Sequence, residues 1–243
     1  TDYEARKRDI LAAAIDTYVE NAAPVSSEIL ARDYGFDLST ATIRNVLADL
    51  EELGFLTHPH TSAGRVPTEK GYRYYVNYLM KKINLLDNER NRIESEYKKS
   101  MKELEKIFDT TSEVLSDFTH CTGLVYFSDL HGRLFYKGAG FMLDQPEFNN
   151  LDKIRQVLKM LEEKQRLIDI ISQQLDKKIK IFIGSELHCH EINDCSLVVS
   201  SYKYKDKSSG RVAVLGPKRM QYAKVVCTVE YLSDLISELL NDF

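Results

Sequence analysis

The segment from Ser39 to Ala48 contains side chains that can read the edges of DNA bases. Arg44 can make two hydrogen bonds to guanine, and Asn45 can make two to adenine. The nearby alanines are small enough to let a helix enter a major groove, and the hydroxyls can bind phosphates at its N-terminus. The competing interpretation is a solvated helix face with an ordinary ion pair. The candidate DNA-contacting residues in this segment are Ser39, Thr40, Thr42, Arg44 and Asn45.

The segment His58–Thr68 is rich in small and turn-forming residues. Its glycine lets the backbone approach a phosphate or enter a minor groove, where an arginine side chain is favoured. His58 and His60 could be metal ligands, but no carboxylate or thiol lies beside them in sequence, so loop or phosphate-binding roles are favoured. The candidate DNA-contacting residues here are His60, Thr61, Ser62, Gly64 and Arg65.

Two later segments carry chemistry-bearing residues in patterns that match no standard site. His188, Cys189, His190 and Cys195 lack zinc-site spacing, and alternation along a strand would point the histidines and Cys189 to opposite faces. Gly216–Met220 could cradle an anion where a helix begins, but it lacks the Gly-Lys-Ser/Thr of a phosphate-binding loop, so a tight turn is favoured. No catalytic triad order, paired catalytic carboxylates or dinucleotide fingerprint is apparent. We expect no metal, no cofactor and no enzymatic activity.

The chain is acidic overall but contains one basic stretch. Its 243 residues carry a formal net charge of −4, with a pI of about 5.9, which argues against a uniformly basic nucleic-acid-binding protein. Between residues 58 and 82, however, five bases stand against one acid, Glu69, and such a stretch can neutralise several phosphates. The five bases are Arg65, Lys70, Arg73, Lys81 and Lys82.

The first 83 residues have the pattern of a winged helix-turn-helix. Helices capped by serine or threonine are expected over 26–33 and 39–53, after a first helix over 5–21. Residues 55–57 and 65–67 read as two strands joined by a turn-rich loop, which makes a wing. This order is that of a winged helix-turn-helix DNA-binding domain. The stripe expected to be buried on the third helix is Ile43, Val46, Leu47, Leu50 and Leu53.

The rest of the chain predicts a connecting helix and an α+β domain. Residues 84–118 are charged and fit a heptad poorly, so we expect a connecting helix with some dimer packing rather than a coiled coil. From residue 119 to 243, short strands and helices form a sheet of about five strands with flanking helices. The strands are expected at 124–127, 134–136, 179–183, 196–204 and 211–215, and the helices over 146–176 and 221–240.

The composition places this chain among ordinary globular proteins of the cytoplasm. No apolar run reaches the ~18 residues needed to span a bilayer, and residues 1–10 lack the apolar segment of a secretory signal. The four cysteines form no CxxC pair, so reduced, structural thiols are expected.

Motifs along nearly the whole chain resemble the bacterial heat-inducible transcription repressor HrcA family. The most specific of them is the ten-residue run Pro59–Thr68. The other motifs in the first domain are Pro24–Ser27, Ser39–Asn45, Leu50–Glu51, Gly54 and Gly71–Arg73. In the second domain they are Gln145–Phe148, Ile183–Glu186, Ser196–Val198 and Gly216–Tyr222.

The resemblance implies a repressor that binds an inverted-repeat operator upstream of chaperone genes. It implies a winged helix-turn-helix followed by a GAF-like α+β domain, and a homodimer kept active by the chaperonin GroEL until heat diverts the chaperonin. It places DNA contacts at Ser39, Thr40, Thr42, Arg44 and Asn45 on the helix, and at the wing residues from His60 to Arg65. It adds Arg73 as a contact to the DNA backbone.

One departure from the family pattern concerns dimerisation. Members of the family usually carry a sizeable inserted dimerisation segment in the second domain, whereas here Tyr126–Leu130 passes almost directly into Leu134–Gly138. The helix at 84–118 and the GAF-like domain are the remaining candidates for the dimer contact.

Two other functions compete with a repressor. A small-molecule-responsive regulator would have a metabolite pocket in the GAF-like domain, largely apolar with a few convergent polar groups. A protein-interaction module would have its basic stretch paired internally by Asp49, Glu51 and Glu52.

Overall fold

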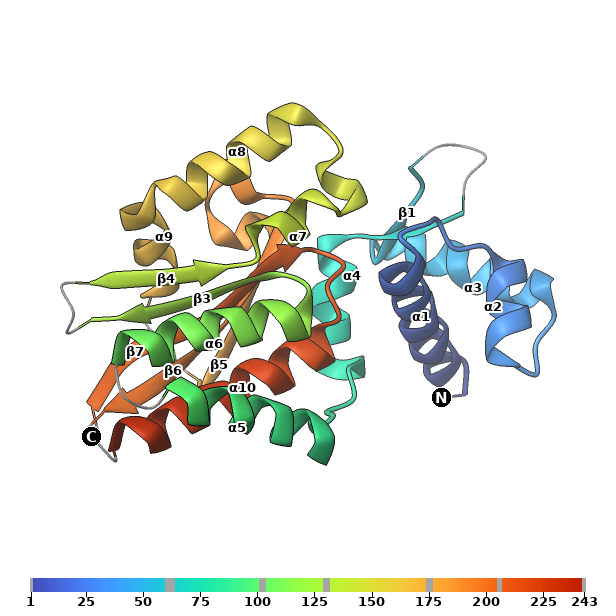
Figure 1. Cartoon of the computed structure of the whole chain (residues 1–243). Helices are drawn as coiled ribbons and strands as arrows, with labels where there is room; N and C mark the ends of the chain where they lie inside the picture. The colour runs from blue at the N-terminus through green and yellow to red at the C-terminus, as the bar shows by residue number, and fades with distance from the viewer. Residues whose placement is uncertain are drawn as a thin grey trace. The chain divides into compact units, whose positions relative to one another are not determined.

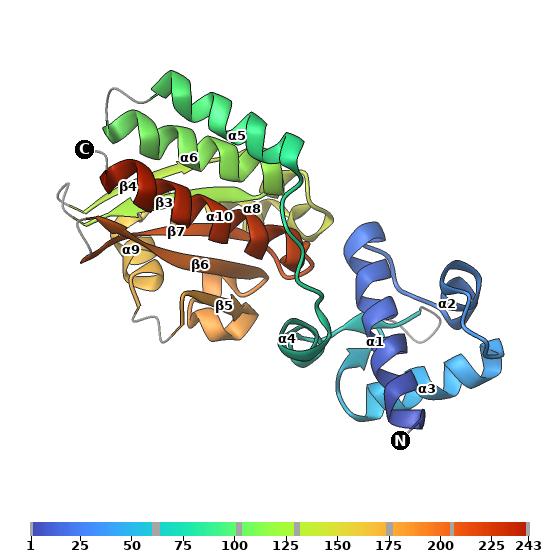
Figure 2. The same cartoon turned by 90° about the horizontal axis from the view of Figure 1, so that it is seen from below.

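The computed structural model describes residues 2–59, 64–100, 104–128, 132–173, 177–204 and 207–241. The chain divides into two compact units, Thr1–Lys81 and Lys82–Phe243, each with its own helices and strands (Figures 1 and 2). The division falls close to the expected end of the first domain.

The first unit begins with three helices, α1 (Asp2–Asn21), α2 (Ser27–Tyr34) and α3 (Thr40–Glu52). Local sequence sets their ends. Ser26 and Ser39 each accept a hydrogen bond from a backbone N–H in the first turn of the following helix, as N-caps do. Gly35 ends α2 with φ of +57°, a left-handed conformation that glycine adopts without steric cost.

A small antiparallel hairpin follows α3 and is anchored to the segment between α1 and α2. Strand β1 (Leu56–Thr57) pairs with β2 (Val66–Pro67), and the next residue outward, Arg65, forms a bridge with Val25. Thr68 caps α4 (Glu69–Tyr74), which continues into the π-helix η1 (Tyr75–Leu79). The elements expected for a helix-turn-helix and a wing are therefore present in the expected order.

The third helix is held by an apolar stripe, which we call the α3 stripe: Ile43, Val46, Leu47 and Leu50, each at most 2% exposed. Leu53 was expected to extend it, and this prediction is wrong because Leu53 is 47% exposed. The helix ends at Glu52 and the chain turns at Gly54, with φ of +75°, so Leu53 leaves the helical phase. Leu56 on β1 is the next buried side chain.

In the second unit, one face of a sheet is covered by α6 (Leu104–Thr119) and α10 (Tyr222–Asn241), and α5 (Asp87–Ser100) packs on α6. The segment 84–118 was expected to connect the domains, but its two helices belong to this unit. The reason is that α6 has a strongly apolar side, including Ile107 and Phe108, which packs mainly on β3 and β4, the two strands that follow it in sequence. The ring of Phe108 lies 4.9 Å from that of Phe127, centroid to centroid.

The sheet has five strands in the order β4-β3-β7-β6-β5, with every neighbouring pair antiparallel. The strands β3 (Thr122–Phe127) and β4 (Arg133–Lys137) are consecutive. The family's inserted segment would fall between them, where residues 129–131 lie outside the described residues. The other strands are β5 (Ile179–Ile183), β6 (Cys195–Tyr204) and β7 (Lys207–Pro217).

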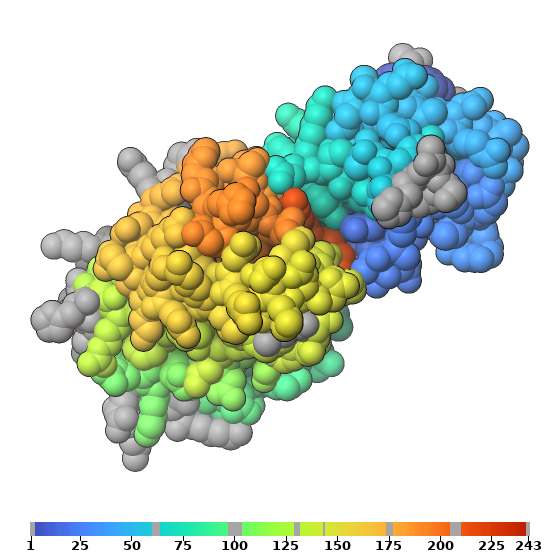
Figure 3. All heavy atoms as spheres, turned by 90° about the horizontal axis from the view of Figure 1, so that it is seen from above, coloured from blue at the N-terminus to red at the C-terminus, as the bar shows by residue number. Residues whose placement is uncertain are grey.

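A second layer of helices covers the opposite face, which gives the α+β, GAF-like architecture expected from the sequence. Figure 3 shows the outer side of this layer, with the residues of α8 in yellow. The layer consists of α7 (Ala139–Leu143), η2 (Pro146–Phe148), α8 (Leu151–Glu162), α9 (Lys164–Ile171), η3 (Gly184–Leu187) and η4 (His190–Ile192).

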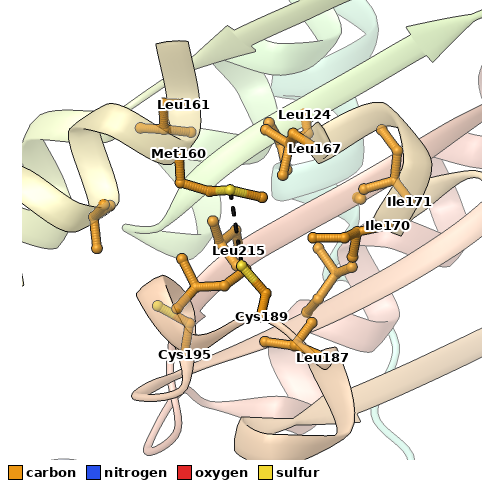
Figure 4. Close-up of a cluster of buried hydrophobic side chains, with 14 of the residues drawn as sticks. Leu124, Met160, Leu161, Leu167, Ile170, Ile171, Leu187, Cys189, Cys195 and Leu215 are labelled. Atoms are coloured by element: carbon orange, nitrogen blue, oxygen red, sulfur yellow. Dashed lines mark hydrogen bonds between the residues drawn. The ribbon is translucent and has the colours of Figure 1, made fainter. Parts of the chain in front are cut away.

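The core beneath this layer includes two of the cysteines (Figure 4). Cys189 is 2% exposed, and its sulfur lies 3.9 Å from that of Met160. Residues 184–187 and 190–192 form two 3₁₀ turns, so the alternation of a strand does not apply to His188 and Cys189. Within the described ranges, no group of three or more His, Cys, Asp or Glu side chains is arranged to hold a metal ion.

The Gly216–Met220 segment is a tight turn whose charged side chains bind other protein groups. Arg219 Nε lies 2.6 Å from Glu147 Oε1, and Arg219 Nη2 donates to Gln145 Oε1 at 2.5 Å. The two charged side chains are 14% and 23% exposed, respectively. Two motifs shared with the HrcA family are thus joined by one ion pair, and the favoured interpretation of a turn is confirmed.

Replacing Arg219 by Met is expected to lower the free energy of unfolding by about 2 kcal/mol, because a mostly buried carboxylate loses its partner. The loss is below the ~3–5 kcal/mol of a fully buried pair because Glu147 retains some contact with water. Urea unfolding at neutral pH measures it.

The control is Arg155→Met, which breaks an ion pair with Asp152. The Arg155 side chain is 77% exposed and the Asp152 side chain is 81% exposed. It should leave the unfolding midpoint unchanged. Adding Glu147→Gln to Arg219→Met should restore part of the loss. Equal midpoints for Arg219→Met and Arg155→Met would contradict a structural role for Arg219.

Candidate nucleic-acid interface

The face of α3 opposite the α3 stripe is open to solvent. Ala41, Arg44 and Asn45 are exposed, and Thr42 and Ala48 are half-buried. Since the stripe is buried, the 3.6-residue period of the helix fixes this orientation. The predicted helical phase is therefore confirmed, and two side chains able to read bases stand beside a small residue on one surface.

The N-terminus of α3 presents hydroxyl groups that first serve the helix itself. Ser39 Oγ accepts a hydrogen bond from the backbone N–H of Thr42 at 3.1 Å and lies 2.9 Å from Thr42 Oγ1. Ser39 and Thr40 are exposed. Both are near the positive end of the helix dipole, which favours an anion such as a phosphate.

Arg44 is paired with a carboxylate from the preceding helix. Its Nη2 donates to Glu28 Oε1 at 2.8 Å, and the two side chains are 63% and 59% exposed. The pKa of Glu28 lies below its usual range because its carboxylate accepts hydrogen bonds from its own backbone N–H, from the Ser26 hydroxyl and from Arg44. Sequence reasoning missed Glu28 because the two partners meet only through the crossing of α2 and α3.

The base of the wing is tied to α3 by Glu51. Arg65 Nε lies 3.3 Å from Glu51 Oε2, and His58 Nδ1 lies 2.5 Å from Glu51 Oε1. These contacts lower the pKa of Glu51, with the hydrogen bond to His58 as the largest cause. The Arg65 side chain is 14% exposed, so it lies at the foot of the wing rather than at its tip.

Gly64 is the point of closest approach between the wing and the rest of the unit. A Cβ at this position would lie 2.6 Å from both the carbonyl carbon and the oxygen of Val25. The next residue, Arg65, exchanges two backbone hydrogen bonds of 2.9 Å with Val25. Packing against Val25 therefore requires a glycine at this position. The other expected DNA contacts of the wing, His60, Thr61 and Ser62, lie outside the described residues.

Two further basic side chains of the stretch lie on α4. Arg73 is in its last turn and is half-buried. Lys70 donates to the backbone oxygen of Leu53 at 2.6 Å and lies over the ring of Phe55, so it closes the C-terminal end of α3. The predicted site residues thus fall on three elements: the exposed face of α3, the foot of the wing and α4.

The interaction-module alternative requires the basic stretch to be paired by acids of α3. Glu51 does pair with Arg65, but Asp49 lies 3.6 Å from Lys7 on α1 instead. Only part of the expected internal pairing therefore involves the basic stretch.

Two adjoining cavities in the second unit bear on the small-molecule alternative. Their volumes are about 450 and 220 Å³, and both are lined by Arg92, Asp117 and Phe118. Arg92 lies over the Phe118 ring, 5.3 Å from its centroid. Charged groups of both signs line these cavities, unlike the largely apolar sites typical of small-molecule ligands, so they do not favour a metabolite site. The other lining residues are Asn88, Glu89, Ile93, Glu96, Thr110, Glu113, Val114, His120, Phe141 and Lys224.

Comparison with known proteins finds relatives that all belong to one family of transcription repressors. The family model described as "HrcA protein C terminal domain" matches residues 72–226. The heat-inducible transcription repressor HrcA of Carboxydothermus hydrogenoformans is 31% identical over 337 aligned positions, covering 98% of each chain. That of Symbiobacterium thermophilum is 30% identical over 333 positions, covering 96% of this chain and 98% of the relative.

A solved structure described as that of a hypothetical protein shares the fold. It matches 98% of this chain and 97% of its own, with a TM-score of 0.76 and 20% sequence identity. Among the helices in the described ranges, none is both long enough and apolar enough to cross a membrane.

Replacing Gly64 by Ala is expected to open the contact between Val25 and Arg65, because the new methyl group overlaps the Val25 carbonyl. The cost should be about 1–3 kcal/mol, as for other overpacked sites. Hydrogen exchange of the Val25 amide, which donates to Arg65, measures the effect directly.

The matched control is Gly140→Ala, because a Cβ at Gly140 meets no atom within 4 Å. The exchange rate of the Val25 amide should stay unchanged in that variant. An unchanged rate in Gly64→Ala as well would show that the wing does not depend on this close approach.

Proposed function

This chain belongs to the HrcA family, and we propose that it is a heat-inducible transcription repressor that binds an inverted-repeat operator through its first unit. The observation that carries the proposal is the orientation of α3: the α3 stripe is buried, and Arg44 and Asn45 are exposed on the opposite face. A winged helix-turn-helix uses such a helix in the major groove. The named function of the curated relatives agrees with it.

Direct base contacts fall to Arg44 and Asn45, because each offers a bidentate hydrogen-bonding group. The other contacts position the domain on phosphates and carry no sequence information themselves. At the helix N-terminus these come from Ser39, Thr40 and Thr42. In the wing they come from His60, Thr61, Ser62, Gly64 and Arg65, and Arg73 on α4 adds a contact to the DNA backbone.

A protein with a net negative charge can bind DNA in this way because its positive side chains are concentrated in one part of the first unit. The exposed pair between Arg44 and Glu28 is joined by one hydrogen bond, so the other N–H donors of the guanidinium remain available to a base. Arg65 is held more tightly at the foot of the wing, where it fixes the wing relative to α3. The role follows from binding alone and requires neither catalysis nor a cofactor.

An inverted repeat has two-fold symmetry, so the repressor is proposed to act as a homodimer. The half-sites would be separated by whole helical turns, about 34–36 Å for one turn. Because Tyr126–Leu130 passes almost directly into Leu134–Gly138, where the family usually carries its dimerisation segment, the dimer contact is proposed to lie in the second unit. The chaperonin GroEL would keep the dimer active until heat diverts the chaperonin, as the family relationship implies.

The first test selects, from a randomised pool, the DNA duplexes that the chain binds. Binding to the recovered sequence and to a scrambled copy of it is then measured over a series of salt concentrations. The selection should return an inverted repeat, and the scrambled duplex should bind much more weakly. Binding should fall steeply with salt because phosphate contacts release counterions. Arg44→Ala should weaken operator binding about tenfold or more.

Arg32→Ala is the matched control, since Arg32 is an exposed arginine on α2 that pairs with its neighbour Asp33. It should leave the preference for the operator intact. Equal binding of the unaltered chain to operator and scrambled duplexes would contradict the proposal.

A further inference from the structure

The arginine that reads a base must be held in one direction before the base arrives. An arginine side chain has several rotatable bonds, and ordering it on binding costs free energy that lowers both affinity and discrimination. A neighbouring group that orders it in the free protein reduces this cost. In this unit, the group in contact with Arg44 is Glu28.

Glu28 stands at a well-defined place in the helix that precedes α3. It lies in the first turn of α2, directly after the N-cap Ser26, whose side chain accepts a hydrogen bond from the backbone N–H of Ile29. Its negative charge is also favoured there by the helix dipole. The backbone that carries Glu28 is therefore held at a capped helix start, and α2 packs directly against α3.

The contact leaves most of the guanidinium available. A single hydrogen bond of 2.8 Å joins Arg44 Nη2 to Glu28 Oε1. A guanidinium carries five N–H donors, and recognition of guanine uses two of them. Arg44 can therefore keep its bond to Glu28 and still make a bidentate contact with a guanine edge.

The charge of Glu28 also bears on binding to the wrong sequence. Binding without sequence preference is dominated by attraction between basic side chains and phosphates. A carboxylate beside Arg44 neutralises part of that attraction and repels phosphates that approach it. Specificity often combines an attractive element for the right partner with a repulsive one for the wrong partner.

We propose that Glu28 is a positioning residue that determines specificity: it directs Arg44 to a guanine edge and disfavours its pairing with phosphate. This inference rests on the proposed function of the first unit as an operator-binding domain. It assigns the discrimination at one base pair of each half-site to an Arg44–Glu28 pair rather than to Arg44 alone.

The test compares Glu28→Gln with the unaltered chain on three kinds of duplex: the selected operator, operators with one base pair changed, and a scrambled sequence. Gln keeps the size of the side chain and loses its charge. The ratio of operator to scrambled binding should fall about tenfold, with scrambled binding becoming tighter. Glu28→Gln should lose discrimination at the same base pair at which Arg44→Ala loses it. In a chain that already carries Arg44→Ala, adding Glu28→Gln should cause no further loss at that base pair.

Two variants separate positioning from charge and from helix stability. Asp33→Asn removes one negative charge from the same helix, where Asp33 pairs with Arg32, and it should shift all duplexes by a similar factor. Glu28→Asp keeps the charge but shortens the side chain, so it should lose discrimination without tightening scrambled binding. Thermal unfolding of each variant shows that the first unit remains folded.

The inference is overturned if Glu28→Gln and Asp33→Asn shift every duplex by the same factor, while the unaltered chain still prefers the operator. If the unaltered chain has no preference, the proposed function fails, and this inference fails with it. If Glu28→Gln does not fold, Glu28→Asp decides: wild-type discrimination in that variant contradicts the positioning role.

Discussion

The burial of one face of α3 is the constraint on which the rest of the first unit depends. The α3 stripe is at most 2% exposed, and each such side chain contributes about 1.5–3 kcal/mol when fully buried. Rotation of α3 about its axis would expose the stripe. The same burial therefore decides that Arg44 and Asn45 face outward, and it connects the packing of the unit to what its surface can bind.

Carboxylates of the same unit pair with the basic side chains near this surface and fix their positions. Glu51 extends from α3 to Arg65 and His58, so it joins the foot of the wing to the helix. Glu28 meets Arg44 at the exposed face. A chain of net charge −4 can in this way present an ordered, local arrangement of positive charge instead of a diffuse basic surface.

Local signals in the sequence predicted local structure well. The period of the α3 stripe, the Ser39 cap and the five strands of the second unit are all present. Contacts between distant residues could not be predicted, because they depend on how elements cross. Examples are the pairing of Arg44 with Glu28 and the inward position of Arg65.

The central claim is that the exposed face of α3 lies in the major groove of the operator. Interference by methylation at guanine N7, an atom of the major-groove edge, tests it most directly. The account predicts that methylated guanines in both half-sites prevent binding, and that one such position per half-site loses its effect when Arg44 is replaced. Unchanged binding to operators methylated at every guanine N7 would contradict the claim.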